Sequence, residues 1–217
     1  MKSLALIFTL TFTINIFSED VPYEKFYSNG QLSQKGAQRD GEAHGLIETY
    51  HENGLMKWSA YFDYGEYDYG THFTYYPNGK LKEKKEDVNY RNWAGVRSGR
   101  RLNGLQEGYY PSGNIAYRGN IKTIKLLPRF DGPFEQFDEG GRLWKKSNID
   151  RGEYHGKEEF YYRSGTVWAL RNYSLGKEQG PYKKFFENGN IWEKGNIKKG
   201  EVEGRMEIFN RNGKIIE

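Results

Sequence analysis

The chain has 217 residues, of which 27 are glycine and 18 tyrosine, and it contains no cysteine. The lack of cysteine excludes disulfide bonds, thiol catalysis and a cysteine-linked lipid anchor. The formal charge is +4 with acidic and basic residues interspersed, so no basic run indicates a nucleic-acid partner. Only 36% of the residues are hydrophobic and many of these are aromatic, which is typical of half-buried sheets rather than a thick two-layer core.

The first residues have the pattern of a secretory signal peptide. A positively charged start precedes an apolar run of 14 residues, Leu4–Phe17. A membrane-spanning helix needs about 20 apolar residues, so we expect no transmembrane segment. Ser18 provides an acceptable cleavage site. We therefore expect 1–18 to be a signal peptide, 19–217 to be the repeat domain, and the protein to be exported to the periplasm, the envelope or the medium. The alternative is that the apolar run forms a buried strand.

Beyond residue 18 the sequence repeats around regularly spaced glycines. The spacings between these glycines are 24, 25, 34, 28, 24, 24 and 24 residues. Each glycine has an aromatic residue four positions before it and an aliphatic residue two positions after it. The glycines are Gly30, Gly54, Gly79, Gly113, Gly141, Gly165, Gly189 and Gly213; the aromatics are Phe26, Tyr50, Tyr75, Tyr109, Phe137, Tyr161, Phe185 and Phe209; the aliphatics are Leu32, Met56, Leu81, Ile115, Leu143, Val167, Ile191 and Ile215. This period predicts eight tandem units of one structure.

The residues around each glycine predict the type of turn. Asn-Gly alone favours a two-residue type I′ turn, but Pro77 and Pro111 stand two positions before their glycines. Proline favours the second position of a type I turn. We therefore predict three-residue loops, each a type I turn followed by a glycine with positive φ. In this register Tyr75 lies opposite Leu81, so that the two side chains pack on one face of the sheet.

A second set of glycine pairs predicts the connections between hairpins. Gly41–Gly45 and its equivalents are predicted to be turns, with Gly65–Gly70 as a longer version. The fold class is therefore all-β, an elongated, twisted antiparallel meander of eight hairpin repeats with about sixteen strands. Two segments, 82–104 and 116–132, fall where the spacing rises to 34 and 28 residues. We expect these insertions to form loops, which in repeat proteins often lie at the binding face.

The repeat unit resembles the MORN repeat in its shorter bacterial variant form. The clearest matches to the pattern G-x-x-x-x-Y-Y-x-N-G-x-L are Gly70–Leu81 and Gly180–Ile191. The resemblance covers residues 24–217 and extends to the YwqK-type antitoxin family. It implies an elongated sheet of stacked hairpins without catalytic residues. The sequence departs from the eukaryotic MORN pattern, so membrane tethering and phosphoinositide binding are not implied.

Residues that could carry out chemistry stand at repeated positions. His44 and His155 occupy the same slot four repeats apart, so we expect exposed turn residues and no metal site. Glutamates stand two positions before several of the aromatics that precede the turn glycines, and we expect them to form a ladder with lysine or arginine on neighbouring strands. They are Glu48, Glu107, Glu135, Glu159 and Glu207. No nucleophile with a base, and no phosphate-binding loop, is recognisable, including in the insertions. We therefore expect no enzymatic activity and no cofactor.

Aromatic residues form the candidate partner-binding site. Trp144, Trp168 and Trp192 stand three positions after their turn glycines, at a period of 24. Alternation places them on the face opposite the aliphatic residues. The same face should carry the residue that follows the aromatic of each pair, which is Tyr76, Tyr110, Tyr162 or Phe186. These rings either cover that face against one another or form a platform for a partner, because tryptophan and tyrosine are frequent in binding hot spots.

These features predict a non-enzymatic repeat scaffold that binds a protein partner. The family resemblance implies an antitoxin or immunity-type role, although a signal peptide would separate the protein from a cytosolic toxin. The alternative is a cell-wall or glycan-binding module, because choline- and glucan-binding repeats are also short aromatic hairpins. Those repeats have a shorter period, and in them tryptophan precedes the tyrosine pair.

Overall fold

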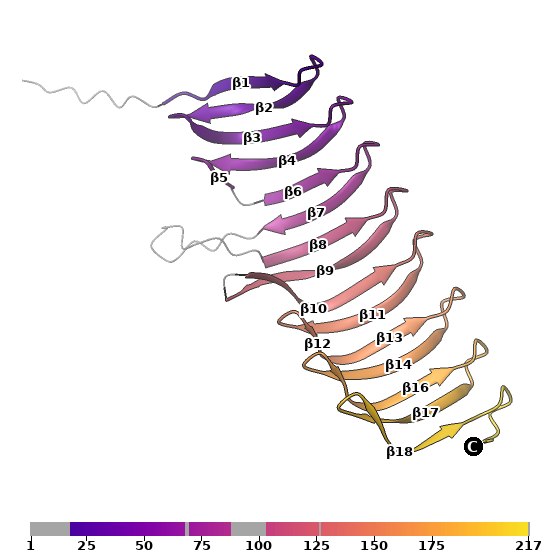
Figure 1. Cartoon of the computed structure of the whole chain (residues 1–217). Coiled ribbons are helices and arrows are strands. Elements are labelled where there is room, and N and C mark those ends of the chain that lie inside the picture. Colours follow the sequence, from indigo (N-terminus) through magenta and orange to yellow (C-terminus); the bar gives the residue numbers. More distant parts are fainter. Residues whose placement is uncertain (1–17, 68–69, 88–102, 126, 217) are drawn as a thin grey trace, which may run out of the picture.

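The computed structural model describes residues 18–67, 70–87, 103–125 and 127–216. Within these ranges all regular structure is β, and eighteen strands form one antiparallel sheet (Figure 1). Strands pair with their neighbours in chain order, which gives the elongated, twisted meander predicted from the sequence. The proposed signal peptide lies outside the described residues, apart from Ser18.

Most hairpin arms are strands of six to eleven residues, and three arms begin with a separate two-residue strand, β5, β12 or β15. The strands are β1 (Val21–Phe26), β2 (Leu32–Arg39), β3 (Glu42–Tyr50), β4 (Met56–Asp63), β5 (Glu66–Tyr67), β6 (Gly70–Tyr75), β7 (Leu81–Asp87), β8 (Asn103–Tyr109), β9 (Ile115–Ile124), β10 (Leu127–Phe137), β11 (Leu143–Asp150), β12 (Glu153–Tyr154), β13 (Gly156–Tyr161), β14 (Val167–Ser174), β15 (Lys177–Glu178), β16 (Gly180–Phe185), β17 (Ile191–Lys198) and β18 (Glu201–Ile208). The last hairpin is completed by a single bridge, Phe209 to Ile215.

The turns within the hairpins have the predicted three-residue geometry. The Tyr76 N–H donates to the Lys80 carbonyl at 2.8 Å, and the Gly79 N–H donates to the Tyr76 carbonyl at 2.9 Å. Gly79 has φ of 81°, a conformation that favours glycine. Tyr75 pairs with Leu81, and the equivalent aromatic–aliphatic pair occurs in all eight units. The predicted register is confirmed.

The connections between hairpins are tighter than predicted. Asp40 and Gly41 have φ of 53° and 84°, typical of a two-residue type I′ turn. The residues after Gly41 already belong to β3, so the predicted five-residue turn Gly41–Gly45 is wrong in this detail. Gly45, with φ of 77°, lies where the β2–β3 register shifts. The first glycine of the pair closes the turn, and the second forms a bulge within the strand.

The two faces of the sheet have different compositions. One face, here called the ladder face, carries the aromatic–aliphatic pairs and the repeated glutamates. The opposite face, here called the core face, carries the buried hydrophobic residues, which are Ile47, Ala60, Ile121, Phe134, Ile149, Ala169, Tyr182 and Ile197. On this face large side chains lie across glycines of the neighbouring strand. A Cβ atom on Gly195 would lie 2.8 Å from the ring of Tyr182. Glycine therefore lets a single-layer sheet bury large side chains.

The glutamate ladder is largely confirmed. Lys35 and Glu48 lie 2.8 Å apart across β2 and β3, and Lys194 and Glu207 lie 3.1 Å apart across β17 and β18. Glu135 is paired with cations on both neighbouring strands, and Glu107 lies 4.0 Å from Lys84. The exception is Glu159, whose closest cation is on its own strand. Exposed ion pairs contribute only about 0–1 kcal/mol each to stability. We therefore infer that this ladder serves mainly to set the strand register and to keep the protein soluble.

The second insertion lengthens a hairpin instead of forming a loop. Ile124 pairs with Leu127, and Thr123 pairs with Pro128, beyond the point where the equivalent hairpins turn. The tip of the β9–β10 hairpin therefore extends past the other turns at this edge of the sheet. Of the first insertion, residues 88–102 lie outside the described residues.

Candidate functional site

The tryptophans lie beside phenylalanines of the core face. Trp144 and Trp168 flank the Phe160 ring, with centroid distances of 6.2 and 5.7 Å. Trp192 lies 6.1 Å from Phe186. Trp144 and Trp192 remain 39% and 37% exposed. The rings thus cover part of this face and also present accessible surface, which leaves both predicted roles for them compatible with the structure.

The position of Trp144 does not follow from simple alternation. Phe137 pairs with Leu143, whereas Gln136 pairs with Lys145, so Trp144 is the extra residue of a β-bulge. A bulge interrupts the alternation of side chains between the two faces. Trp144 contacts Phe160, which pairs with Ala169 on the core face. This contact places the Trp144 ring on the core face.

The predicted tyrosines, together with Tyr27, which was not among them, connect each repeat to the next. Each hydroxyl donates a hydrogen bond to a backbone carbonyl in the following repeat, that of the aromatic residue in the aromatic–aliphatic pair. The pairs are Tyr27–Tyr50 at 2.6 Å, Tyr76–Tyr109 at 2.8 Å, Tyr110–Phe137 at 2.9 Å and Tyr162–Phe185 at 2.8 Å. Phe186 occupies the same slot without a hydroxyl. We infer that these tyrosines stabilise the array, and their contact with a partner stays a prediction.

The turn asparagines form a second set of bonds between repeats. Asn53 Nδ2 donates to the Pro77 carbonyl at 2.6 Å, and Asn78 Nδ2 donates to the Pro111 carbonyl at 2.9 Å. The same asparagine also caps its own turn, because Asn78 Oδ1 accepts a bond from the Lys80 N–H at 3.0 Å. Asparagine in this slot therefore fixes both the turn and its distance to the next one.

We expect Tyr110→Phe to lower the free energy of unfolding by about 1 kcal/mol, because the Phe137 carbonyl loses its donor in a half-buried position. Tyr61→Phe is the matched control, since Tyr61 is 53% exposed, and it should change stability by less than about 0.5 kcal/mol. Urea denaturation followed by circular dichroism measures both variants. Equal effects would contradict the assignment of Tyr110 to the scaffold.

Other tyrosines donate hydrogen bonds to carboxylates, and three of these have a strongly raised pKa. Tyr117, Tyr161 and Tyr182 each have a pKa raised to about 12. Burial is the largest cause, and the neighbouring carboxylates add to the increase. The hydroxyl-to-carboxylate distances are 3.2 Å for Tyr117–Glu83, 2.6 Å for Tyr161–Glu159 and 2.8 Å for Tyr182–Glu193. Ionisation would place a phenolate beside each carboxylate.

These tyrosines predict loss of stability in alkali. The folded pKa of about 12 for Tyr182 exceeds the ordinary tyrosine pKa of 10.0, so its stabilising contribution is complete below pH 10.0 and is lost as the pH rises toward 12. Far-ultraviolet circular dichroism of urea titrations between these pH values should show a falling midpoint. Tyr182→Phe should reduce the slope, and an unchanged slope in all three phenylalanine variants would contradict the prediction.

A buried ion pair lies on the core face, and its Glu158 occupies the repeat position that holds Ile47, Phe134 and Tyr182 in three other units. Glu158 is 2% exposed, and its Oε1 lies 2.6 Å from Lys145 Nζ and accepts a bond from Ser147 Oγ at 3.1 Å. Burial opposes the charge on Lys145, but bonds with Glu158 and Tyr154 raise the Lys145 pKa above its ordinary value. The Glu158 Oε2 atom has no hydrogen-bond partner. Sequence reasoning missed this pair because it assigned Glu159 alone to the ladder.

The histidines in the equivalent turn slots differ. His155 is exposed, as predicted, whereas the His44 side chain is only 17% exposed and its Nδ1 lies 3.3 Å from Asp63 Oδ1. The expectation that both are exposed is therefore wrong for His44, which also contacts the Tyr64 ring. Among the described residues, no group of three or more histidine, aspartate or glutamate side chains is arranged to hold a metal ion.

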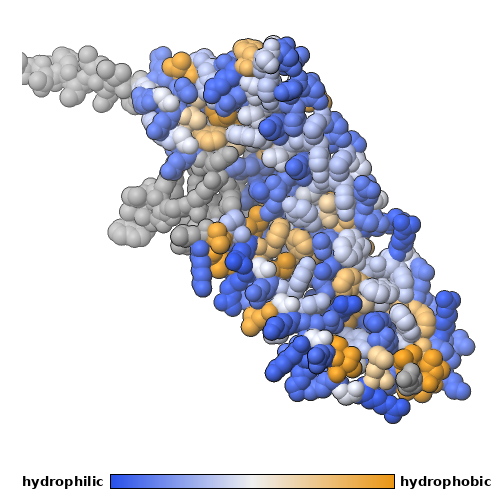
Figure 2. All heavy atoms as spheres, viewed as in Figure 1, coloured by the Kyte–Doolittle hydropathy of each residue, from blue (hydrophilic) through white to orange (hydrophobic). Residues whose placement is uncertain are grey.

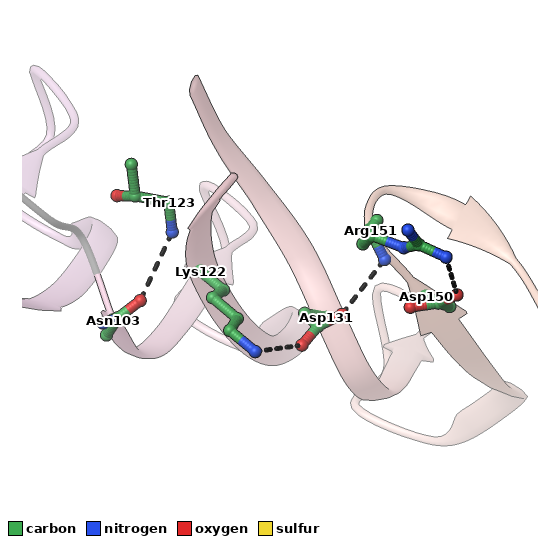
Figure 3. Close-up of polar contacts among 6 residues, drawn as sticks. All are labelled: Asn103, Lys122, Thr123, Asp131, Asp150 and Arg151. Atoms are coloured by element: carbon green, nitrogen blue, oxygen red, sulfur yellow. Dashed lines mark hydrogen bonds and ion pairs between the residues drawn. The ribbon is translucent and has the colours of Figure 1, made fainter. Parts of the chain in front are cut away.

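Polar contacts fix the extended β9–β10 hairpin between its neighbours (Figure 3). Asn103 Oδ1 accepts a bond from the Thr123 N–H at 3.3 Å on one side. On the other side Asp131 accepts a bond from the Arg151 N–H at 3.0 Å, and its second oxygen lies 3.5 Å from Lys122 Nζ. The departure from the repeat period is therefore an ordered part of the sheet edge.

An open sheet of stacked hairpins, in which each unit contacts only its neighbours, defines a β-hairpin repeat scaffold. The family model described as MORN repeat variant matches four segments, 68–92, 102–123, 154–174 and 178–199. These matches support a MORN-repeat protein, in agreement with the resemblance of the unit. A search of curated proteins finds no match. The part of the chain that the structure describes has no helix suited to spanning a bilayer.

Proposed function

We propose that this chain is a non-enzymatic scaffold that binds a protein partner. The supporting observation is a set of large hydrophobic side chains that the sheet leaves exposed, including Tyr61 at 53%, Leu127 at 56% and Leu175 at 60%. Figure 2 shows hydrophobic residues as separate patches among polar ones on the viewed face. Small apolar patches with polar surroundings suit contact with another protein better than burial in a lipid phase.

The absence of a catalytic role is also proposed from how the carboxylates are used. Glu48, Glu135 and Glu207 occupy one repeated position and are paired with lysine or arginine. A carboxylate held by a cation at several equivalent positions serves register, whereas a catalytic pair needs two groups with different environments at one place. Assays of the purified chain against hydrolase and transferase substrates test this part of the proposal.

We place the partner in the cell envelope or outside the cell. This placement depends on the proposed signal peptide, 1–18, and detection of Glu19 as the first residue of the mature protein would support it. An immunity-type role, in which the partner is a toxin, is suggested by the family resemblance. Co-expression with the recovered partner tests that role, because an antitoxin should abolish the toxicity of its partner.

The partner is tested by crosslinking in the native host. An affinity-tagged full-length chain is crosslinked in envelope fractions, and the recovered proteins are identified by mass spectrometry. A single specific protein that rebinds the purified chain would support the proposal. Recovery of no specific protein from either envelope or medium would count against it.

A glycan or cell-wall ligand is the second candidate, favoured by the exposed rings of Trp144 and Trp192. Aromatic rings at one repeat interval are suited to stacking on successive sugars. Sedimentation with isolated cell walls measures binding, and Trp144→Ala, Trp168→Ala and Trp192→Ala should abolish it, whereas Tyr61→Ala should not. Retention that is equal in all variants would reject this alternative.

A further inference from the structure

The extended hairpin forms one side of a cleft at the turn edge of the sheet. Its tip and the next two turns, Asp150–Glu153 and Ser174–Lys177, surround a space of about 390 Å³. The insertion in 116–132 creates this cleft, because the tip extends past the neighbouring turns. It is therefore a feature of this chain at one position and not a property of every repeat.

Two exposed leucines line the cleft. Leu127 is 56% exposed and Leu175 is 60% exposed. Leu175 has φ of 49° in the first central position of its turn, the position that is held in the equivalent turns by Asp40, Tyr64, Lys125, Arg151 and Lys199. A bulky residue with positive φ is strained. The fold gains little packing from this leucine, which suggests that its side chain serves a contact with another molecule.

Two cations without carboxylate partners lie beside the leucines. Arg129 extends across Gly152, where an added Cβ would lie 3.0 Å from its Cδ. The carboxylate of Asp150 is already paired with Arg151 at 3.2 Å. Within the described residues, Lys125 and Arg129 have no carboxylate within ion-pair distance. The carboxylate of Glu153 also lines the cleft. With Asp150 paired to Arg151, the cleft offers apolar contacts together with two cations, Lys125 and Arg129, against this one carboxylate.

The dimensions of the cleft suit an extended segment. Successive turns are two strands apart, which at about 4.8 Å per strand is about 10 Å. Three turns therefore span about 20 Å, the length of roughly six residues at 3.3 Å each. A segment lying along the turns would reach both leucines and both cations.

We propose that this cleft docks an extended segment of the protein partner in which aliphatic side chains alternate with carboxylates. The aliphatic side chains contact Leu127 and Leu175, and the carboxylates bind Lys125 and Arg129, the arginine through two parallel hydrogen bonds. This inference rests on the proposed function, because it names where and how the partner binds.

The probe is a library of short linear peptides displayed on phage and selected on the full-length chain. Selected peptides should share acidic and aliphatic residues, and their affinity should fall with salt. Fluorescence polarisation should show at least about tenfold weaker binding to Arg129→Glu and to Leu175→Asn. Leu175→Asn places a residue that tolerates positive φ and so keeps the fold. Leu55→Asn, at an exposed turn on the other edge, should bind as the unchanged chain does.

Two outcomes would overturn the docking site. One is selection of no peptides, or of peptides without this pattern; the other is equal affinity for the unchanged chain and Arg129→Glu. The crosslinked partner separates this failure from that of the general proposal. A partner that binds Arg129→Glu and Leu175→Asn with unchanged affinity leaves protein binding intact and rejects the cleft. Absence of any partner, with peptides that require the cleft, rejects the scaffold role in the native host instead.

Discussion

Gly119→Val is expected to lower the free energy of unfolding by about 2–3 kcal/mol. Gly119 faces the core side of β9, where an added Cβ would lie 2.6 Å from the Phe134 ring and 3.3 Å from the Pro133 carbonyl oxygen. The ring has little freedom to move, because it is 8% exposed and lies 4.7 Å from the Phe130 ring. Urea denaturation followed by tryptophan fluorescence measures the change.

The neighbouring residue provides a matched control for Gly119→Val. Asn120 is exposed on the other face of the same strand, so Asn120→Val should change stability by less than about 0.5 kcal/mol. Combining Gly119→Val with Phe134→Ala should cost less than the sum of the two single changes, because valine then fills part of the space left by the ring. Strict additivity would show that the two side chains do not compete for one volume.

The hairpin turns could be predicted from the sequence because their chemistry is local. Proline fixes its own φ, and Pro77 with Gly79 is compatible with one loop type, which in turn places Tyr75 opposite Leu81. The period then extends this result to every unit. The face assignment of the paired aromatics follows from the same two facts. The period predicts about sixteen strands, whereas the structure has eighteen, because three hairpin arms begin with a separate two-residue strand.

Other features were not predictable because they depend on non-local contacts. Gly45 has the same residue type as a turn glycine, yet it forms a bulge, since its conformation is set by pairing with β2. The insertion at 116–132 has no marker that distinguishes a loop from two longer strands. The cleft beside it requires residues from three separate turns, whose proximity is a property of the assembled sheet.

The candidate binding residues show the same division. The sequence shows that Trp144 and Tyr110 each stand at a position that recurs with the repeat. It does not show the acceptor of the Tyr110 hydroxyl, which is a backbone carbonyl in the next repeat. Recurrence of tyrosine before the turn was the available signal, because a hydroxyl kept at one repeat position indicates a bond that recurs with the repeat. Leu175 carried no signal, since its exposure and positive φ appear only in three dimensions.

Lys145→Met is expected to destabilise the protein by about 3–5 kcal/mol, because it leaves the Glu158 carboxylate buried without a cation. The Lys145 side chain is 11% exposed and that of Glu158 is 2% exposed, so water cannot replace the lost partner. Lys35→Met removes a similar contact with Glu48, but the Lys35 side chain is 44% exposed. That control should cost no more than about 1 kcal/mol. Urea midpoints of the two variants give the comparison.

Replacing both members of the buried pair separates the strength of the pair from the cost of breaking it. Lys145→Met with Glu158→Leu should recover most of the lost stability, because no charge then remains in the core face. The equivalent residues Ile47 and Phe134 show that this position accepts apolar side chains. Ser147 loses its acceptor in the double variant, which costs about 1 kcal/mol and limits the recovery. A double variant as unstable as Lys145→Met would mean that the charged pair itself, and not merely its completeness, holds these two strands in register.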